Sequence, residues 1–240
     1  MSEETAGDLP QRFVFIVTYA RSGSTLLQAL LNSCPGVLIR GENYNALFHL
    51  YRAIRAMDET RAKHGGTSGA DQPDDPWFGA HQVQPRNFEA RAIQAFVRRV
   101  LAPPPGVSVT GFKEIRYNRH FITAADFAPY MTFLLNRFPG ARLVFNSRRA
   151  EAEAASGFVA QQGQPLSRVQ SWVAEADASF AAFARANPER TRHMQYEDWT
   201  LDHGQIHELL GFLDLDWTPE GVASVMSKRL THAQPAQPRG

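Results

Sequence analysis

The 240-residue sequence has little of what stabilises many small or membrane-bound proteins. Its single cysteine, Cys34, excludes an intrachain disulfide, and no group of cysteine and histidine has the spacing of a zinc site. No apolar run approaches the length of a membrane span, and the N-terminal residues lack the basic and apolar regions of a signal peptide. With 43% hydrophobic residues, the chain can still build a large core. These features predict a soluble, cytoplasmic protein without a metal.

Lysine is also scarce in this chain. The basic residues, 25 in total, include only three lysines, Lys63, Lys113 and Lys228, so that the others are arginines. The formal net charge is only +1, which argues against a general nucleic-acid-binding protein. Because lysine is rare here, Lys113 is of interest as the lysine that directly follows a predicted strand.

The chain is organised around residues 13–31. The apolar run Phe13–Val17 predicts a strand that is buried on both faces of a parallel sheet. A polar turn, Tyr19–Thr25, follows it, and leucines at helical spacing come next. Backbone N–H groups at such a helix start, together with the helix dipole, form a site for an anion. Gly23 allows a phosphate to approach the backbone closely, and Arg21 adds a full positive charge.

Strands and helices alternate along the rest of the chain. Further strands are predicted at residues 37–40, 107–112, 142–147 and 191–196. This alternation predicts one α/β domain over residues 1–240, a P-loop-like three-layer sandwich with a central parallel sheet flanked by helices. Ligands of such sheets bind at the carboxyl ends of the strands, where the turn, Lys113 and Arg148 all fall.

Three segments are predicted from turn and capping residues. Thr60–Pro85 is rich in glycine and proline and too long for a simple connection, which predicts a loop that acts as a lid or substrate loop. Ser167 and Gln170 have the spacing of a capping box at the start of a long helix. The polar, proline-rich residues 231–240 predict a mobile tail.

The polar turn is not a Walker A loop, because it has one glycine and no lysine before its hydroxyl pair. It resembles instead the phosphosulfate loop of sulfotransferases that use 3′-phosphoadenosine 5′-phosphosulfate (PAPS). Many bacterial members of that family carry proline where Ala20 stands here. The resemblance implies that the donor nucleotide is bound by Arg21, Ser22, Gly23, Ser24, Thr25 and Leu26.

Two later segments agree with this resemblance. Arg148 follows the strand 142–147, and Ser156 comes eight positions later on a predicted helix. In the family, an arginine and a serine at this spacing bind the 3′-phosphate of PAPS, with two donors from the guanidinium and one from the hydroxyl. Tyr196, followed by Glu197 and Asp198, matches a Tyr-Glu-Asp sequence that the family often carries, with the tyrosine near the adenine.

The resemblance implies in-line attack of a hydroxyl or amine on sulfur, with release of 3′,5′-ADP. The acceptor is expected to be a small molecule, a carbohydrate or a lipid. Such transfer depends on positioning and electrostatics. Arg21 and Lys113 are the candidate catalytic cations. Glu42 is the candidate base, close to Arg40 in the sequence and placed like a glutamate of some carbohydrate-directed bacterial members. The position of the histidine base of many eukaryotic members holds Ile115. Other candidate bases are Glu114, His49, His81 and His120.

Two alternatives to a sulfotransferase remain open at this point. A P-loop kinase or NTPase needs a Walker lysine, and an aspartate at a strand end to hold Mg²⁺. Neither is found, since the strand 142–147 ends in serine and is followed by Arg148. A non-catalytic nucleotide-binding relative would keep both phosphate-binding segments and lose the catalytic groups.

Overall fold

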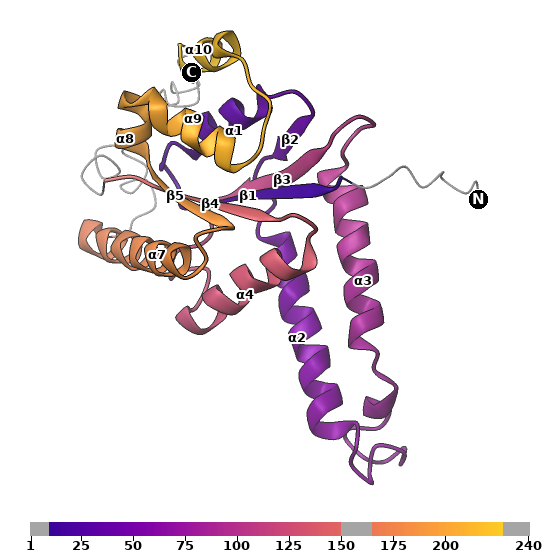
Figure 1. Ribbon diagram of the computed structural model, residues 1–240. Coiled ribbons are helices and arrows are strands. Elements are labelled where there is room, and N and C mark those ends of the chain that lie inside the picture. The colour runs from indigo at the N-terminus through magenta and orange to yellow at the C-terminus, as the bar shows by residue number, and fades with distance from the viewer. Residues whose placement is uncertain (1–9, 150–164, 228–240) are drawn as a thin grey trace, which may run out of the picture.

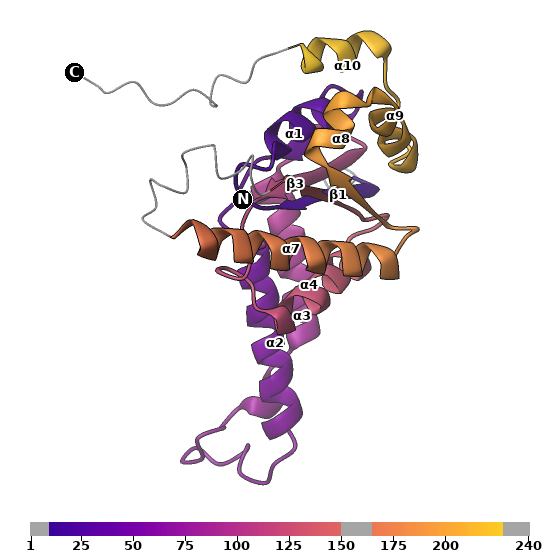
Figure 2. The same ribbon diagram turned by 90° about the vertical axis from the view of Figure 1, so that its left-hand side faces the viewer.

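The computed structural model describes residues 10–149 and 165–227 of the chain. Its strands form one parallel sheet in the order β2-β3-β1-β4-β5. The strands are β1 (Arg12–Thr18), β2 (Val37–Arg40), β3 (Val109–Glu114), β4 (Arg142–Ser147) and β5 (Thr191–Gln195). Helices lie above and below this sheet (Figures 1 and 2). The predicted three-layer α/β sandwich with a central parallel sheet is therefore confirmed.

Each face of the sheet is covered by a different set of helices. The upper layer in Figure 1 contains α1 (Ser24–Asn32), α8 (Tyr196–Leu201), α9 (His203–Phe212) and α10 (Pro219–Met226). The lower layer contains α2 (Ala46–His64), α3 (Pro85–Phe96), α4 (Ala124–Arg137) and α7 (Leu166–Ala186). A π-helix, η2 (Val97–Leu101), continues α3. Among the described residues, no helix is long and apolar enough to cross a membrane.

The central strand β1 contributes side chains to both layers. Phe13, Phe15 and Val17 belong to the lower core, whereas Val14 and Ile16 belong to the upper core. All five side chains are buried. Successive side chains of a strand point to opposite faces, so a strand covered on both sides must be apolar throughout. This is why β1 is one continuous apolar run rather than an alternating one.

The close pairing of β1 with β3 depends on a glycine. Gly111 lies opposite Val14 in the parallel register, and a Cβ atom at Gly111 would overlap the Val14 backbone. This pairing aligns the carboxyl ends of the two strands, with Val17 opposite Glu114. The turn after β1 and the side chains that end β3 are thereby brought to the same edge of the sheet.

The prediction of a loop over Thr60–Pro85 is wrong at both ends. α2 continues through His64, and Pro85 is the first residue of α3, a position that favours proline. Basic residues in the last turn of α2 suit the negative end of the helix dipole and help to extend the helix. The true connection, 65–84, includes a short 3-10 helix, η1 (Ala80–Gln82), and lies at the far end of α2 and α3 from the sheet (Figure 1). A role as a lid or substrate loop stays a prediction.

Two other predicted boundaries differ from the structure. The capping box is wrong, because α7 begins at Leu166 with Pro165 as its N-cap, so that Ser167 lies inside the helix. The strand predicted at residues 107–112 begins and ends two residues later, which places Lys113 inside β3. The predicted helix that carries Ser156 and the predicted mobile tail 231–240 lie outside the described residues.

We predict that Gly111→Ala lowers the free energy of unfolding by about 2–4 kcal/mol, because the new methyl group forces β1 and β3 apart. Chemical denaturation followed by circular dichroism measures the change. Gly66→Ala is the matched control, since a Cβ there meets no atom within 4 Å. Equal stability of the two variants would contradict the close strand pairing.

Candidate functional site

The turn between β1 and α1 leaves backbone N–H groups open at the start of a helix. Arg21 and Gly23 both adopt left-handed backbone conformations, with φ of 63° and 80°. Gly23 is the N-cap of α1, and no side chain caps this end of the helix. The amide of Leu26 donates to the Gly23 carbonyl oxygen (2.9 Å), whereas the amides of Ser24 and Thr25 precede the first hydrogen bond within the helix. These two amides and the helix dipole give the turn the chemistry to bind an anion.

A buried asparagine at the end of β4 holds this turn in place. The Asn146 side-chain amide donates to the Ser22 carbonyl oxygen (2.8 Å), and the Trp199 indole N–H donates to Asn146 Oδ1 (3.0 Å). The Thr18 hydroxyl donates to the Asn146 carbonyl oxygen (2.6 Å), and the hydroxyls of Thr18 and Ser22 are 2.6 Å apart. Ser22 is fully buried, so its hydroxyl shapes the turn from inside.

The second predicted phosphate-binding segment lies against this turn. The Arg148 guanidinium donates from Nη1 to the Arg21 carbonyl oxygen (3.0 Å) and lies 4.7 Å from the centre of the Tyr196 ring. Arg148 Nε is 3.6 Å from the Glu197 carboxylate. The Tyr196 ring in turn covers Gly23 so closely that a Cβ atom there would overlap it. Arg21, Gly23, Arg148 and Tyr196 are therefore neighbours, whereas Ser156 lies outside the described residues.

Two guanidinium groups at this edge carry buried N–H donors without a hydrogen-bond partner. The Nε atoms of Arg21 and Arg148 are buried and make no hydrogen bond with the residues that the structure describes. A buried unpaired donor is costly, and more so when it is charged. A ligand with two anionic groups would satisfy both arginines and the open end of α1. The residues present thus fit a nucleotide that carries two separate phosphate-type groups.

A cluster of alternating charges lies beside the turn, at the end of β3. Lys113 Nζ lies 2.6 Å from Glu42 Oε1, and Arg116 Nη1 lies 3.6 Å from Glu42 Oε2. The Lys113 side chain is 6% exposed and that of Glu42 is 35% exposed. Arg40 is not part of the cluster, because it donates to the carbonyl oxygens of Leu101 and Ala102. The structure therefore pairs two of the predicted catalytic residues, with the carboxylate reachable from solvent.

Glu114 shapes the segment that carries Glu42. Its carboxylate is fully buried and accepts hydrogen bonds from the backbone N–H groups of Asn43 (3.1 Å) and Asn45 (2.9 Å). Arg116 Nη1 donates to the same carboxylate (2.8 Å). Tyr44 and Asn45 are both left-handed, with φ of 56° and 57°, a conformation that costs energy for residues other than glycine. The buried carboxylate stabilises this strained segment and so fixes the position of Glu42.

The three histidines that the sequence leaves open as bases lie elsewhere. His81 pairs with Asp71 (3.3 Å) in the connection at the far end of α2 and α3. His49 lies on α2, and the His120 ring lies 5.1 Å from the Trp172 ring. Within the described part of the chain, none of the three forms a hydrogen bond or ion pair with Glu42 or Lys113.

A polar cluster that the sequence analysis missed lies behind Arg148. Asp177 of α7 accepts hydrogen bonds from Ser147 and from the Tyr19 hydroxyl, and His193 Nε2 is 2.7 Å from the Ser147 hydroxyl. Burial raises the pKa values of Tyr19 and Asp177 and lowers the pKa of His193. Asp177 lies 30 positions after Ser147 in the chain, so no local motif joins them.

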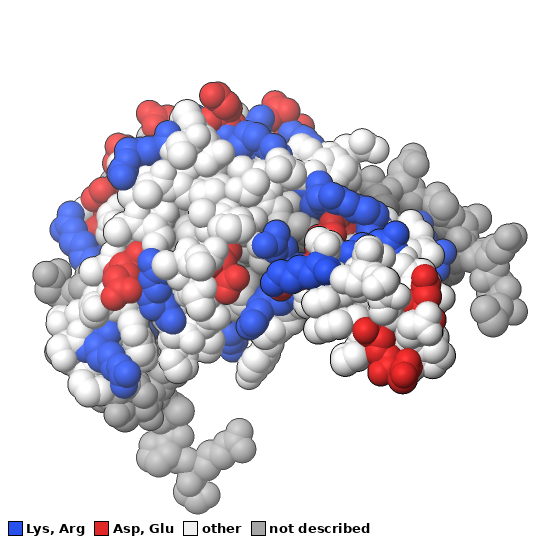
Figure 3. Space-filling view, turned by 90° about the horizontal axis from the view of Figure 1, so that it is seen from below, with Lys and Arg blue, Asp and Glu red and all other residues white. Residues whose placement is uncertain are grey.

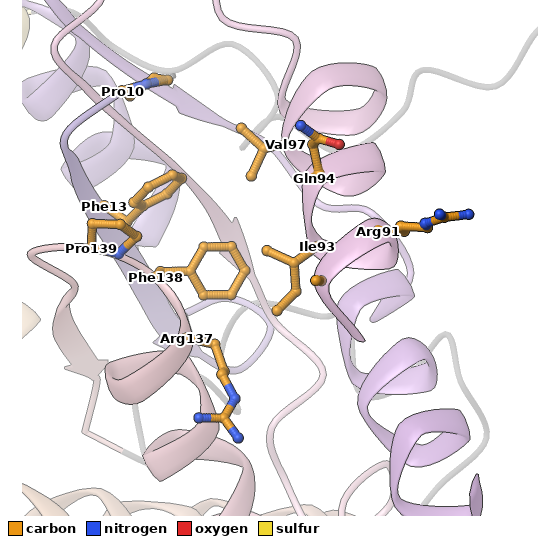
Figure 4. A pocket seen from close by; sticks show the side chains of 10 residues that line it. Pro10, Phe13, Arg91, Ile93, Gln94, Val97, Arg137, Phe138 and Pro139 are labelled. Atoms are coloured by element: carbon orange, nitrogen blue, oxygen red, sulfur yellow. The ribbon is translucent and has the colours of Figure 1, made fainter. Parts of the chain in front are cut away.

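Two hollows lie away from this edge of the sheet. One of about 340 Å³ is at the amino end of β1, with a mainly apolar lining of Phe13, Ile93, Val97 and Phe138 (Figure 4). The other, of about 540 Å³, lies between α2, α3 and α4 and is lined by charged residues of both signs. Basic and acidic side chains also alternate across the lower face of the molecule (Figure 3). In residues 10–149 and 165–227, no three histidine, cysteine or acidic residues are grouped to hold a metal ion.

A family model described as the sulfotransferase family matches residues 13–219. The sulfotransferase domain of the olefin synthase from Synechococcus PCC 7002 aligns with a TM-score of 0.52 at 19% identity, over 95% of this chain and 82% of that one. A sulfotransferase domain of the curacin biosynthetic pathway aligns with a TM-score of 0.55 at 17% identity, over 94% and 82% of the two chains. No curated protein matches.

We predict that Asn146→Ala lowers the free energy of unfolding by about 2–4 kcal/mol, because it leaves the Ser22 carbonyl and the Trp199 N–H unpaired in the interior. Urea denaturation measures the loss. Asn87→Ala is the control. The exposed Asn87 side chain donates a hydrogen bond to the side chain of Gln84, the N-cap residue of α3. We therefore expect this substitution to change the free energy of unfolding by about 0.5 kcal/mol or less. A similar small change at Asn146 would contradict its role in holding the turn.

Proposed function

The chain belongs to the sulfotransferase family and transfers a sulfuryl group, and we propose that PAPS is its donor. The acceptor in this proposal is a hydroxyl or amine of a small molecule, a carbohydrate or a lipid, and the second product is 3′,5′-ADP. The observation that carries the proposal is the contact between Arg148 and the β1–α1 turn. It brings two anion-binding groups together at one edge of the sheet, as a donor with a 5′-phosphosulfate and a 3′-phosphate requires.

Each end of the donor has its own binding residues in this proposal. Arg21, Ser22, Gly23, Ser24, Thr25 and Leu26 form the turn that binds the 5′-phosphosulfate. Arg148 binds the 3′-phosphate together with Ser156, and Tyr196 lies near the adenine. The buried Nε atoms of Arg21 and Arg148 have no hydrogen-bond partner among the described residues, which supports this assignment because an anionic oxygen of a ligand would be a strong acceptor for them.

The reaction is an in-line displacement at sulfur. The acceptor oxygen or nitrogen forms a bond to sulfur while the bond from sulfur to the 5′-phosphate oxygen breaks, and that oxygen leaves with the electron pair as part of 3′,5′-ADP. Glu42 accepts the proton of the acceptor. Arg21 and Lys113 stabilise the negative charge that develops on the transferred group and on the leaving oxygen.

The ion pair of Glu42 with Lys113 supports these roles. The distance of 2.6 Å fixes the carboxylate beside the ammonium group, so base and cation occupy one small region. Arg116 holds the other carboxylate oxygen, at 3.6 Å. A base must reach the proton that it removes, and 35% exposure leaves the Glu42 carboxylate open to an acceptor.

We predict that 3′,5′-ADP raises the melting temperature of the protein and that 5′-AMP does so far less at the same concentration. A ligand that binds only the folded state stabilises it as its concentration exceeds its Kd. Differential scanning fluorimetry with EDTA present measures both shifts, with Mg-ATP in a separate series. Arg148→Ala should remove most of the difference between the two nucleotides.

Stabilisation by Mg-ATP alone would overturn the PAPS assignment and favour a kinase or NTPase. Equal stabilisation by 3′,5′-ADP and 5′-AMP would show that the protein does not recognise the 3′-phosphate. Both outcomes would leave the membership of the family and the fold intact, because neither depends on the bound nucleotide.

A second prediction concerns catalysis. We expect Glu42→Gln and Lys113→Ala each to lower the rate of 3′,5′-ADP release from PAPS, with a panel of hydroxyl and amine acceptors, by about 100-fold or more. The affinity for 3′,5′-ADP should stay the same, because neither side chain forms a hydrogen bond or ion pair with the turn or with Arg148 within the described residues.

Glu59→Gln and Lys63→Ala are the controls for this experiment. Glu59 and Lys63 form an exposed ion pair at the far end of α2, so the same chemical changes are made away from the sheet edge. Full activity of Glu42→Gln and Lys113→Ala would show that other groups catalyse the transfer. Lost activity together with lost nucleotide affinity would assign the two residues to binding rather than to catalysis.

A further inference from the structure

The backbone of Arg148 is held by a single phenol. The Arg148 N–H donates to the Tyr19 hydroxyl (2.8 Å). The one proton of that hydroxyl lies between two acceptors, the Arg148 carbonyl oxygen at 3.0 Å and the Asp177 carboxylate at 3.3 Å. The Tyr19 side chain is 1% exposed, and its ring stacks on Phe180 with centres 6.2 Å apart. A ring packed in this way holds its hydroxyl at a fixed point. Tyr19, the first residue of the anion-binding turn, therefore fixes the backbone of Arg148, the residue that follows β4.

The Asp177 carboxylate also lies within hydrogen-bonding distance of this phenol. One of its carboxylate oxygens lies 3.3 Å from the Tyr19 hydroxyl, and the other accepts the proton of the Ser147 hydroxyl. Because Ser147 donates to Asp177, its oxygen accepts from His193 Nε2, at 2.7 Å. The carboxylate thus binds the first residue of the turn and the last residue of β4 at once. It touches neither the Arg148 side chain nor the charged cluster around Glu42 within the described residues.

We propose that Tyr19 and Asp177 are positioning residues that set the affinity for the 3′-phosphate by fixing Arg148. The inference rests on the proposed PAPS donor and on Arg148 as its 3′-phosphate ligand. Arg148 directly follows Ser147, the last residue of its strand, and so lies outside the hydrogen-bonded ladder of the sheet. Without the phenol, the hydrogen bond that the Arg148 backbone N–H donates would be lost, and the guanidinium would bind an anion from a less defined position. Preorganised groups bind more tightly because less freedom is lost on binding.

The side-chain contacts of Arg148 cannot replace the hydrogen bond between its backbone and Tyr19. Its guanidinium lies over Tyr196, near Glu197 and against the Arg21 carbonyl, and all three contacts are to its outer part. These contacts select a direction for the guanidinium only if its Cα is already in place. Tyr19 provides that fixed point, and Asp177 keeps the Tyr19 hydroxyl turned toward it.

The test is Tyr19→Phe, which removes one hydroxyl and keeps the ring packing. Calorimetric titration gives the Kd of 3′,5′-ADP and of 5′-AMP for the wild type and the variant. We expect Tyr19→Phe to weaken 3′,5′-ADP about three- to tenfold, the effect of one hydrogen bond. The affinity for 5′-AMP should not change. Asp177→Ala should likewise weaken the binding of 3′,5′-ADP and leave the affinity for 5′-AMP unchanged.

A double-mutant cycle with Arg148→Ala distinguishes a role of Tyr19 in positioning Arg148 from a general loss of structure. If Tyr19 acts through Arg148, Tyr19→Phe has no further effect on 3′,5′-ADP once Arg148 is alanine. Additive losses would overturn the inference, and so would equal weakening of both nucleotides or unchanged affinity in Tyr19→Phe. If Arg148→Ala leaves the affinity of the otherwise wild-type protein unchanged, the proposed 3′-phosphate ligand is wrong, and the inference falls with it.

Two further variants guard against loss of structure. Tyr51→Phe removes the hydroxyl of another buried tyrosine, on α2, and should leave both affinities unchanged. Glu175→Ala changes an exposed carboxylate two residues from Asp177 on α7 and should also have no effect. Thermal melts show whether each variant is folded at the titration temperature. A loss of 3′-phosphate discrimination in either control would contradict the specific role of Tyr19 and Asp177.

Discussion

The site depends on the hydrogen bonds of one buried side chain, Asn146. This amide connects the turn after β1, through the Ser22 carbonyl, with α8, through the Trp199 indole, while its own backbone carbonyl accepts from Thr18. Buried polar groups must be paired, so each partner restricts the others to one arrangement. The turn keeps its left-handed residues, Tyr196 is held over Gly23, and the end of β4 stays beside the turn.

Charge is distributed at this edge in two different ways. In the cluster around Glu42, cations and carboxylates alternate, and each charge has an opposite neighbour, as in the pair of Glu42 with Lys113. At the turn, the buried Nε atoms of Arg21 and Arg148 have no hydrogen-bond partner within the described part of the chain, although Arg148 Nε lies 3.6 Å from the Glu197 carboxylate. Buried donors of this kind either receive a partner from a bound ligand or lower the stability of the protein.

The sequence predicted the elements that depend on local signals. The apolar run of β1 and the alternation of strands and helices gave the three-layer sandwich, and the family resemblance gave the turn and Arg148. Boundaries were less accurate. Residues 60–64 continue α2 because tertiary context and a favourable helix end outweigh the nearby glycines, and Ser167 lies inside α7 although its spacing suits a capping box.

What the sequence determined by itself is the order of strands and helices and the residue types at the strand ends, because periodicity and turn chemistry act over a few neighbouring residues. The tertiary structure alone decided two further features. One is the ion pair of Glu42 with Lys113. The other is the set of hydrogen bonds by which Tyr19, with Asp177 beside it, holds the backbone of Arg148. These partners are separated by tens of residues or more, and the parallel register of the sheet together with the position of α7 beside it brings them within hydrogen-bonding distance. A buried hydroxyl or carboxylate shows no signal in the sequence until its partners are known, because its role is set by what it contacts.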